Sequence, residues 1–135
     1  MSLRRQSRIV AMQMLYQIQL TNAPVPVVME QFWQSHDPSE KLRPFAVELV
    51  EGTTSHLEVI DELLQNTSKN WKLHRMPIVD LSILRCAAYE ILYISDIDAA
   101  TSINEAIEIA KVYSTPDSSK FINGVLDNIQ KTKNT

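Results

Sequence analysis

Residues 117–127 of this chain read Asp117-Ser118-Ser119-Lys120-Phe121-Ile122-Asn123-Gly124-Val125-Leu126-Asp127. The apolar residues of this stretch recur at the three- and four-residue spacing of a helix with one buried face. Asn123-Gly124 lies inside the pattern, although Gly costs about 1 kcal/mol against Ala in a helix interior. Two explanations of Gly124 stay open: it relieves crowding between two core helices, or it lets the backbone of a partner approach closely.

Helical periodicity continues outward from this stretch to both ends of the chain, and no segment shows the sustained alternation of a strand. The sequence therefore predicts an all-α protein, with three helices in residues 1–68 and three or four in residues 69–135. The predicted helices cover about 3–20, 26–35, 40–66, 77–93, 102–113 and 116–129.

Three features set the boundaries in the second half of the chain. Ser102 followed by Glu105 is a capping-box pattern, which predicts that a helix starts at Ser102. Pro77 suits the first turn of the preceding predicted helix, and Pro116 suits the first turn of the following one. In the connection at 67–76, Trp71 is expected to anchor the loop to the core.

Composition excludes several classes of protein. The net charge of −3 argues against indiscriminate coating of nucleic acid. The charged residues are distributed unevenly along the chain. Residues 1–29 carry three arginines and no acid, whereas residues 30–66 contain eight acidic residues and only two basic ones, Lys41 and Arg43. A small basic face on an acidic body suits selective binding of a polyanion.

Catalytic and metal sites find no support in the sequence. The three histidines lie on three different predicted elements without ligand-like spacing, and Cys86 is the sole cysteine. Its apolar neighbours predict a small buried hydrophobic residue. No glycine-rich phosphate loop is present, and no apolar run approaches the roughly 18 residues of a membrane span. We therefore expect a cytoplasmic protein that is not an enzyme and has no cofactor or metal.

The first predicted helix places Arg4, Arg5 and Arg8 in its opening turns. Positive charge there opposes the helix dipole, which favours acids at this end. The three charges therefore contribute unfavourably to the stability of this helix, and an anionic partner bound to them would reverse the sign of that contribution. Arginines beside aromatic side chains are also typical of surfaces that bind single-stranded RNA. The alternative interpretation is a frayed, solubilising start of the helix.

Four blocks of the sequence resemble the NusB family of bacterial transcription antitermination factors. The first block is Arg4-Arg5-x-x-Arg8-x-x-Ala11-x-Gln13-x-Leu15-Tyr16-Gln17, and the second is Asp80-x-x-Ile83-Leu84-Arg85-x-Ala87-x-Tyr89-Glu90. The third is Ile103-Asn104-Glu105-Ala106-x-Glu108-x-Ala110-Lys111, and the fourth is the stretch 117–127. Their order and spacing are family-like, whereas residues 21–70 show only helical periodicity.

The resemblance implies two helical subdomains packed crosswise, about 1–68 and 69–135, in a single RNA-binding domain without catalytic activity. It also implies binding of the box A segment of nascent RNA together with the small-subunit ribosomal protein NusE. That complex joins other Nus factors on RNA polymerase and suppresses termination in ribosomal RNA operons.

Site residues follow from the resemblance position by position. The residues implied to contact RNA are Arg4, Arg5, Arg8, Lys120, Phe121 and Asn123, with Asp117 at the margin. The residues implied to face the protein partner are Tyr16, Asp80 and Leu84. For Glu90, Glu105 and Arg85, the preferred interpretation is that they form ion pairs that orient helices.

Leu81 departs from the family pattern, because a basic residue is expected after Asp80. Two other interpretations stay open. The chain could be a helical protein-interaction adaptor without RNA binding, its arginines merely solvated. It could also form a homodimer that buries Tyr16, Met12 and the basic residues.

Overall fold

The computed structural model describes residues 2–133, and no strand occurs among them. The prediction of an all-α protein is confirmed. The elements are α1 (Leu3–Thr21), α2 (Val25–His36), the short 3₁₀ turn η1 (Glu40–Leu42), α3 (Arg43–Ser55), α4 (Leu57–Thr67), the turn η2 (Leu73–Arg75), α5 (Ile78–Tyr93), α6 (Ala99–Tyr113) and α7 (Pro116–Lys133).

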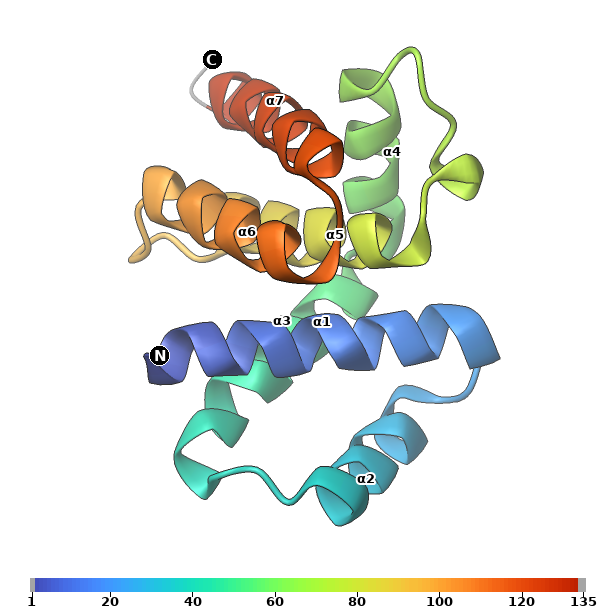
Figure 1. Cartoon of the computed structure of the whole chain (residues 1–135), viewed down its shortest axis with the longest axis vertical. Helices are drawn as coiled ribbons and strands as arrows, with labels where there is room; N and C mark the ends of the chain where they lie inside the picture. Colours follow the sequence, from blue (N-terminus) through green and yellow to red (C-terminus); the bar gives the residue numbers. More distant parts are fainter. Residues whose placement is uncertain (1, 134–135) are drawn as a thin grey trace.

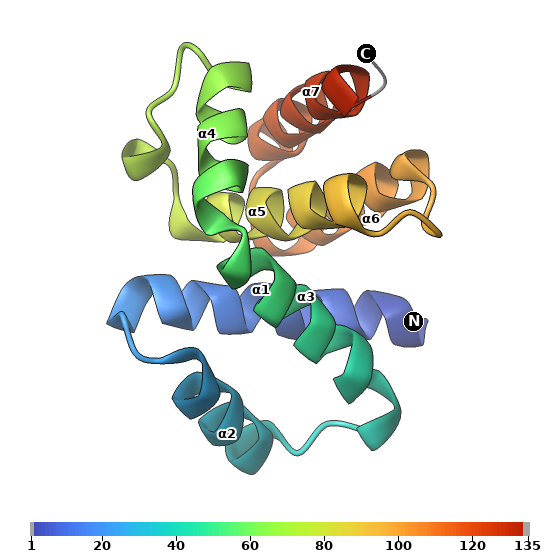
Figure 2. The ribbon, with the colours of Figure 1, turned by 180° about the vertical axis from the view of Figure 1, so that it is seen from behind.

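Two groups of helices are stacked on one another (Figures 1 and 2). At one end, α1 crosses α3 and also packs on α2. At the other end, α5 lies between α4, α6 and α7, and it also contacts α1 and α3. The helix α4 packs on α5 and α7. The division into subdomains near residue 68 stays a prediction.

The helix α5 is the centre of the core. Its residues are buried on nearly every side, including Leu81, Leu84, Ala88 and Ile91, as the periodicity predicted. A helix that buries residues on nearly every side requires such enclosure by other helices. Cys86 is also buried here, which confirms its role as a small hydrophobic residue, and burial raises the pKa of its thiol far above the usual range.

The single helix predicted over residues 40–66 is wrong, because the chain forms η1, α3 and α4 with a break at His56. The His56 ring nitrogen Nδ1 lies 2.9 Å from the carbonyl of Gly52, one turn earlier. Gly52 itself lies under the Tyr89 ring of α5, where an added Cβ would come within 2.0 Å of Tyr89 Cζ. The break lets α3 pack on α1 while α4 turns toward α7.

The predicted capping box at Ser102 is also wrong. The helix α6 begins one turn earlier, with Asp98 as the N-cap residue. Ser102 is buried, and its hydroxyl donates a hydrogen bond of 3.0 Å to Glu90 of α5. The Glu105 side chain accepts a hydrogen bond from Arg5 of α1. Both polar side chains therefore serve contacts between helices.

Trp71 does not anchor the connection between α4 and α5, since 55% of its surface is exposed. Met76 is buried instead, and Leu73 packs partly against the core. In the described part of the chain, no helix combines the length and the hydropathy needed to cross a membrane.

Candidate nucleic-acid and protein interface

Arg8 is a buried residue, with only 5% of its surface exposed. Its Nε and Nη2 atoms donate to the Glu90 carboxylate at 2.9–3.1 Å, and Ser102 donates to the same carboxylate. Such a two-pronged arginine–carboxylate pair is among the stronger polar contacts in proteins. The expectation that Arg8 contacts RNA is therefore corrected: in this structure its guanidinium is enclosed and joins α1 to α5.

Arg4 and Arg5 reach two further neighbours. The half-buried Arg5 donates from Nε to Glu105 of α6 at 2.6 Å, and this hydrogen bond raises the pKa of Arg5 above its ordinary value. The Arg4 guanidinium is exposed and lies 4.1 Å from the centre of the Phe45 ring on α3. Both cations remain accessible at the surface.

Ion pairing of Glu90, Glu105 and Arg85 is confirmed. Arg85 donates twice to Asp61 of α4, each time at 2.8 Å, and once to Gln19 of α1. The Glu90 carboxylate accepts from Arg8, and the Glu105 carboxylate accepts from Arg5. These pairs connect helices that are distant in the sequence.

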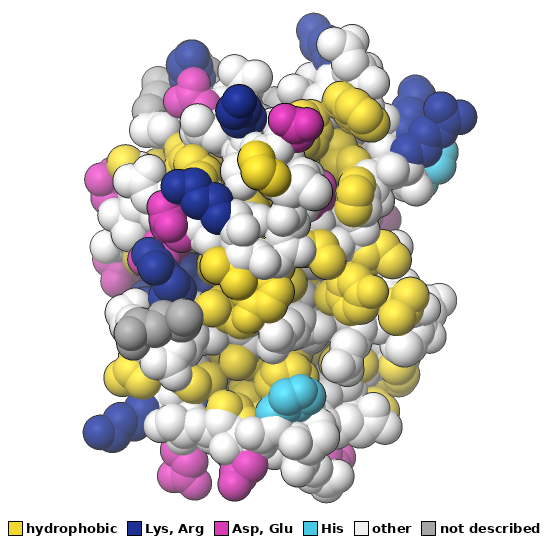
Figure 3. Space-filling view, in the orientation of Figure 1, with side chains coloured by type: hydrophobic (Ala, Val, Ile, Leu, Met, Phe, Trp, Pro, Cys, Tyr) yellow, Lys and Arg dark blue, Asp and Glu magenta, His cyan; other side chains and the backbone are white. Residues whose placement is uncertain are grey.

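Lys120 and Asn123 are exposed on α7 and line a shallow groove between α6 and α7. The groove also contains Lys111, which is exposed on α6 and pairs with Glu108. Figure 3 shows Lys and Arg side chains interspersed with carboxylates along this edge of the molecule, from α7 past α6 to the start of α1. We name Arg5, Lys111 and Lys120 the basic strip.

Gly124 lies on the exposed face of α7, and an added Cβ would meet no atom within 4 Å outside its own helix. The expectation that it relieves crowding between core helices is therefore wrong. Its backbone is open to approach from outside the protein. This is the property that a close contact with a partner would use.

Replacing Gly124 by Ala should raise the free energy of unfolding by about 1 kcal/mol, because Ala has the higher helix propensity and the site is open. Urea denaturation of the Gly124→Ala variant and its parent would measure the difference. A variant less stable than the parent would show that the glycine has a packing role that the open surroundings hide.

Phe121 and Asp117 lie on a different side of α7 from the basic strip. They line a second groove together with Trp71 and Arg75 from the connection between α4 and α5. The Phe121 ring is half-buried, and Asp117 is exposed in the first turn of α7. The residues expected to form one RNA surface are thus divided between two grooves.

Of the three residues expected to face a protein partner, only Tyr16 is accessible. Its ring is half-buried in a groove shared with Met12 and Leu20 of α1, Val79 of α5 and Tyr113 of α6. Several large apolar side chains surround this groove, which suits a protein contact.

Asp80 and Leu84 are enclosed, and their expected contact with a partner is corrected. Leu84 is fully buried. Asp80 is 4% exposed and accepts hydrogen bonds from the hydroxyls of Ser114 at 2.5 Å and Ser118 at 2.7 Å. Asp80 thus fixes the junction of α6 and α7 against the start of α5. Leu81, the departure from the family pattern, is buried beside it.

Sequence reasoning missed Lys111, Trp71 and Arg75 as surface residues beside the candidate sites. The signal for the last two was available, because residues 69–75 contain three Lys or Arg residues and no acid. In residues 2–133, no three His, Cys, Asp or Glu side chains gather closely enough to hold a metal ion.

Comparison with known proteins gives a consistent result. Residues 5–131 match the family model described as the NusB family. The chain is similar to the transcription antitermination protein NusB of Trichlorobacter lovleyi, with 45% identity over 96% of this chain and 92% of that protein. It is also similar to the protein of the same name from Myxococcus xanthus, at 41% identity over 96% of this chain and 95% of that one.

Solved structures share the fold. NusB from T. maritima superimposes with a TM-score of 0.86 and 35% identity, covering 95% of this chain and 90% of that one. A chain from a complex of the antitermination factors NusB and NusE with double-stranded RNA gives a TM-score of 0.89, covering 98% of both chains. Its 22% identity limits that likeness to the fold.

Proposed function

Because the chain belongs to the NusB family, we propose that it is a transcription antitermination factor. It binds the box A segment of nascent RNA together with the ribosomal protein NusE. With other Nus factors on RNA polymerase, this complex suppresses termination in ribosomal RNA operons. The site of action is the cytoplasm, where bacterial transcription takes place, and the protein is a regulator rather than an enzyme.

The observation that carries this proposal is the similarity over the whole chain to proteins named transcription antitermination protein NusB. The similarity reaches 45% identity over 96% of the chain, so it includes the helices that form the two grooves proposed for RNA. The surface is consistent with this function, because exposed cations from α1, α6 and α7 lie along one edge.

The residue assignments are part of the proposal. Arg5 and Lys120 contact RNA phosphates, and Lys111 joins them from α6. Asn123 offers its amide to a base or sugar, while the open backbone at Gly124 allows that contact to be close. Arg4 extends the surface at the start of α1, and Phe121 with Asp117 at its margin adds a second contact region. Tyr16 and its groove receive NusE.

A titration of labelled box A-like single-stranded RNA tests the proposal. We expect binding whose affinity falls linearly with salt on a logarithmic plot, because neutralised phosphates release counterions. Addition of NusE should tighten the binding. A helical adaptor without an RNA role would show no salt-dependent binding in the same titration, and that outcome would contradict the proposal.

Light scattering or analytical ultracentrifugation of the same sample would show whether a homodimer competes with RNA. In that case, RNA should shift the protein from dimer to monomer, because the dimer would hide Tyr16 and the nearby cations. An oligomeric state that RNA does not change would show that no homodimer competes with RNA, and a monomer mass without RNA would remove the homodimer from consideration.

A further inference from the structure

The connection between α4 and α5 combines positive charge with an exposed aromatic ring. Residues 68–77 contain Lys69, Lys72 and Arg75 together with His74, and they contain no acid. Trp71 lies at the centre of this segment with 55% of its surface exposed. Large apolar side chains are usually buried, so a half-exposed tryptophan within a basic segment requires a reason.

The backbone beneath Trp71 is held in place. The Gln65 side chain donates from Nε2 to the Trp71 carbonyl at 2.9 Å and accepts from the Leu73 N–H at 3.1 Å. The Trp71 N–H donates to the Ser68 carbonyl at 2.9 Å, and Met76 is buried after the loop. The indole is therefore presented to solvent by a fixed loop, which reduces the entropy lost when a ligand binds.

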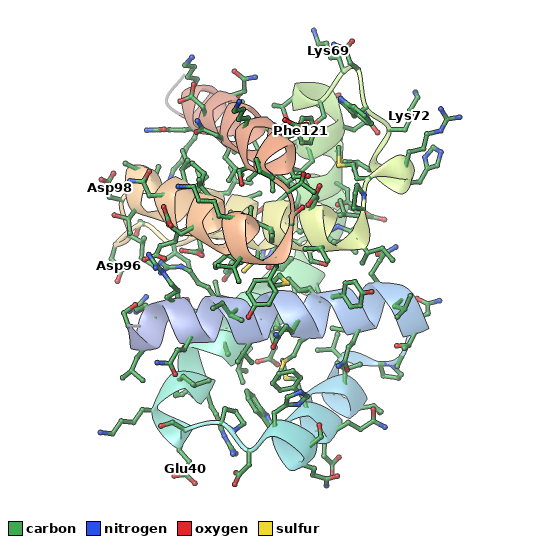
Figure 4. The ribbon with its side chains drawn as sticks, in the orientation of Figure 1. Glu40, Lys69, Lys72, Asp96, Asp98 and Phe121 are labelled. Atoms are coloured by element: carbon green, nitrogen blue, oxygen red, sulfur yellow. The ribbon has the colours of Figure 1, made fainter. Side chains whose placement is uncertain are left out.

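A second ring stands beside it. Phe121 of α7 lies with its ring centre 6.1 Å from that of Trp71, at an interplanar angle of 64°. Both rings line one groove, whose other walls include Arg75, Met76 and Pro77. Figure 4 shows Phe121 on α7 beside this loop, with Lys69 and Lys72 extending outward from it.

The surroundings of the groove favour an anionic ligand. Lys, Arg and His side chains gather over this corner of the molecule, next to hydrophobic ones (Figure 3). Two carboxylates line the groove, of which Asp80 is buried under two serine hydroxyls and Asp117 is exposed. The labelled acids Asp96 and Asp98 lie at the opposite side of the molecule (Figure 4).

We propose that Trp71 and Phe121 form a stacking subsite for an unpaired RNA base, with Lys69, Lys72 and Arg75 holding the adjoining phosphates. Exposed aromatic rings within a basic groove are the usual means of holding single-stranded nucleic acid. The inference rests on the proposed function and deepens it. The RNA then follows two sides of α7, with phosphates on the basic strip and a base in this groove.

Base-deleted RNA tests the subsite directly. One abasic position is moved along a box A-like RNA, and the affinity of each RNA is measured for the parent and for Trp71→Ala. We expect Trp71→Ala to weaken binding of the intact RNA by about 5- to 150-fold, the range for loss of one stacked base. One abasic position should weaken binding to the parent by a similar factor and have no further effect on the variant.

Two more readouts separate stacking from charge and from unfolding. The salt dependence of Trp71→Ala should match that of the parent, whereas Lys72→Ala should make it shallower, because only the lysine neutralises phosphate. The urea midpoint of Trp71→Ala should be unchanged, since its indole is exposed. Tyr93→Ala serves as the matched control, because Tyr93 is a similarly exposed ring near the far end of α5.

Each outcome is decisive. A parent protein that binds no RNA would overturn the proposed function itself. A parent that binds RNA while Trp71→Ala binds equally well would overturn the subsite alone. The subsite would also be overturned if every abasic position changed the RNA affinity of Trp71→Ala by the same factor as that of the parent. If Trp71→Ala retained RNA affinity but lost affinity for NusE, the groove would belong to the protein partner and the inference would be wrong.

Discussion

Replacing Arg8 by Ala should lower the free energy of unfolding by about 3–5 kcal/mol, the usual cost of removing one partner of a buried ion pair. The change leaves the Glu90 carboxylate, which is 1% exposed, without its guanidinium. The Ser102 hydroxyl would remain as a hydrogen-bond donor to it, but a hydroxyl carries no compensating charge. Urea denaturation followed by circular dichroism would measure the loss.

Two controls show that the effect comes from the buried charge. Arg5→Ala removes a cation from the same turn of α1, but from a side chain that is 36% exposed, so the urea midpoint should hardly change. Arg8→Met combined with Glu90→Leu removes both charges and should recover much of the stability, because an apolar pair avoids the desolvation of two ions. An Arg8→Ala variant as stable as Arg5→Ala would show that Arg8 has no structural role.

The positions of most helices could be predicted because local signals determine them. The start of α5 after Pro77 and the start of α7 at Pro116 follow from the fixed backbone angle of proline. The break at His56 could not be predicted in this way. Apolar residues continue at helical spacing on both sides of it, while the packing next to it, the Tyr89 ring over Gly52, involves a helix about 35 residues later.

The candidate RNA surface was predicted only in part, for a similar reason. Arg4, Arg5 and Arg8 look equivalent in the sequence, since all three lie in the first two turns of one helix. Their roles differ because Glu90 and Glu105 approach from α5 and α6, and the local sequence does not show which arginine each carboxylate meets. The existence of these ion pairs was predicted, whereas the burial of Arg8 was not.

Resemblance to a family shows which positions correspond, but it does not show how deeply each side chain is buried. Asp80 and Leu84 occupy matched positions, but α5 is enclosed by five other helices, and its apparent polar face turns inward. Asp80 can lie there because two serine hydroxyls from the junction of α6 and α7 satisfy its carboxylate. Tyr16 lies on α1 where one face stays open, so the same kind of transfer placed it at an accessible groove.

Removing the three cations of the basic strip should weaken RNA binding by about 125-fold, at about 5-fold for each contact. The variant carries Arg5→Ala, Lys111→Ala and Lys120→Ala, which come from α1, α6 and α7. Because each cation neutralises one phosphate, the slope of log affinity against log salt should become shallower by about 2, or about 0.7 per contact on a single strand. Anisotropy titrations at four salt concentrations would provide both quantities.

Lys41→Ala is the matched control, because Lys41 is an exposed lysine on η1, outside both candidate grooves. A uniform effect of net charge would make Lys41→Ala as harmful as any one of the three substitutions. If the basic strip binds phosphate, the loss of affinity should be confined to substitutions of Arg5, Lys111 and Lys120.

Arg5 must also exchange its hydrogen bond with Glu105 for one with phosphate. Glu105→Gln should therefore strengthen RNA binding, because it frees the guanidinium and removes a repelling carboxylate. Weaker RNA binding by Glu105→Gln would mean that Arg5 acts only while Glu105 orients it.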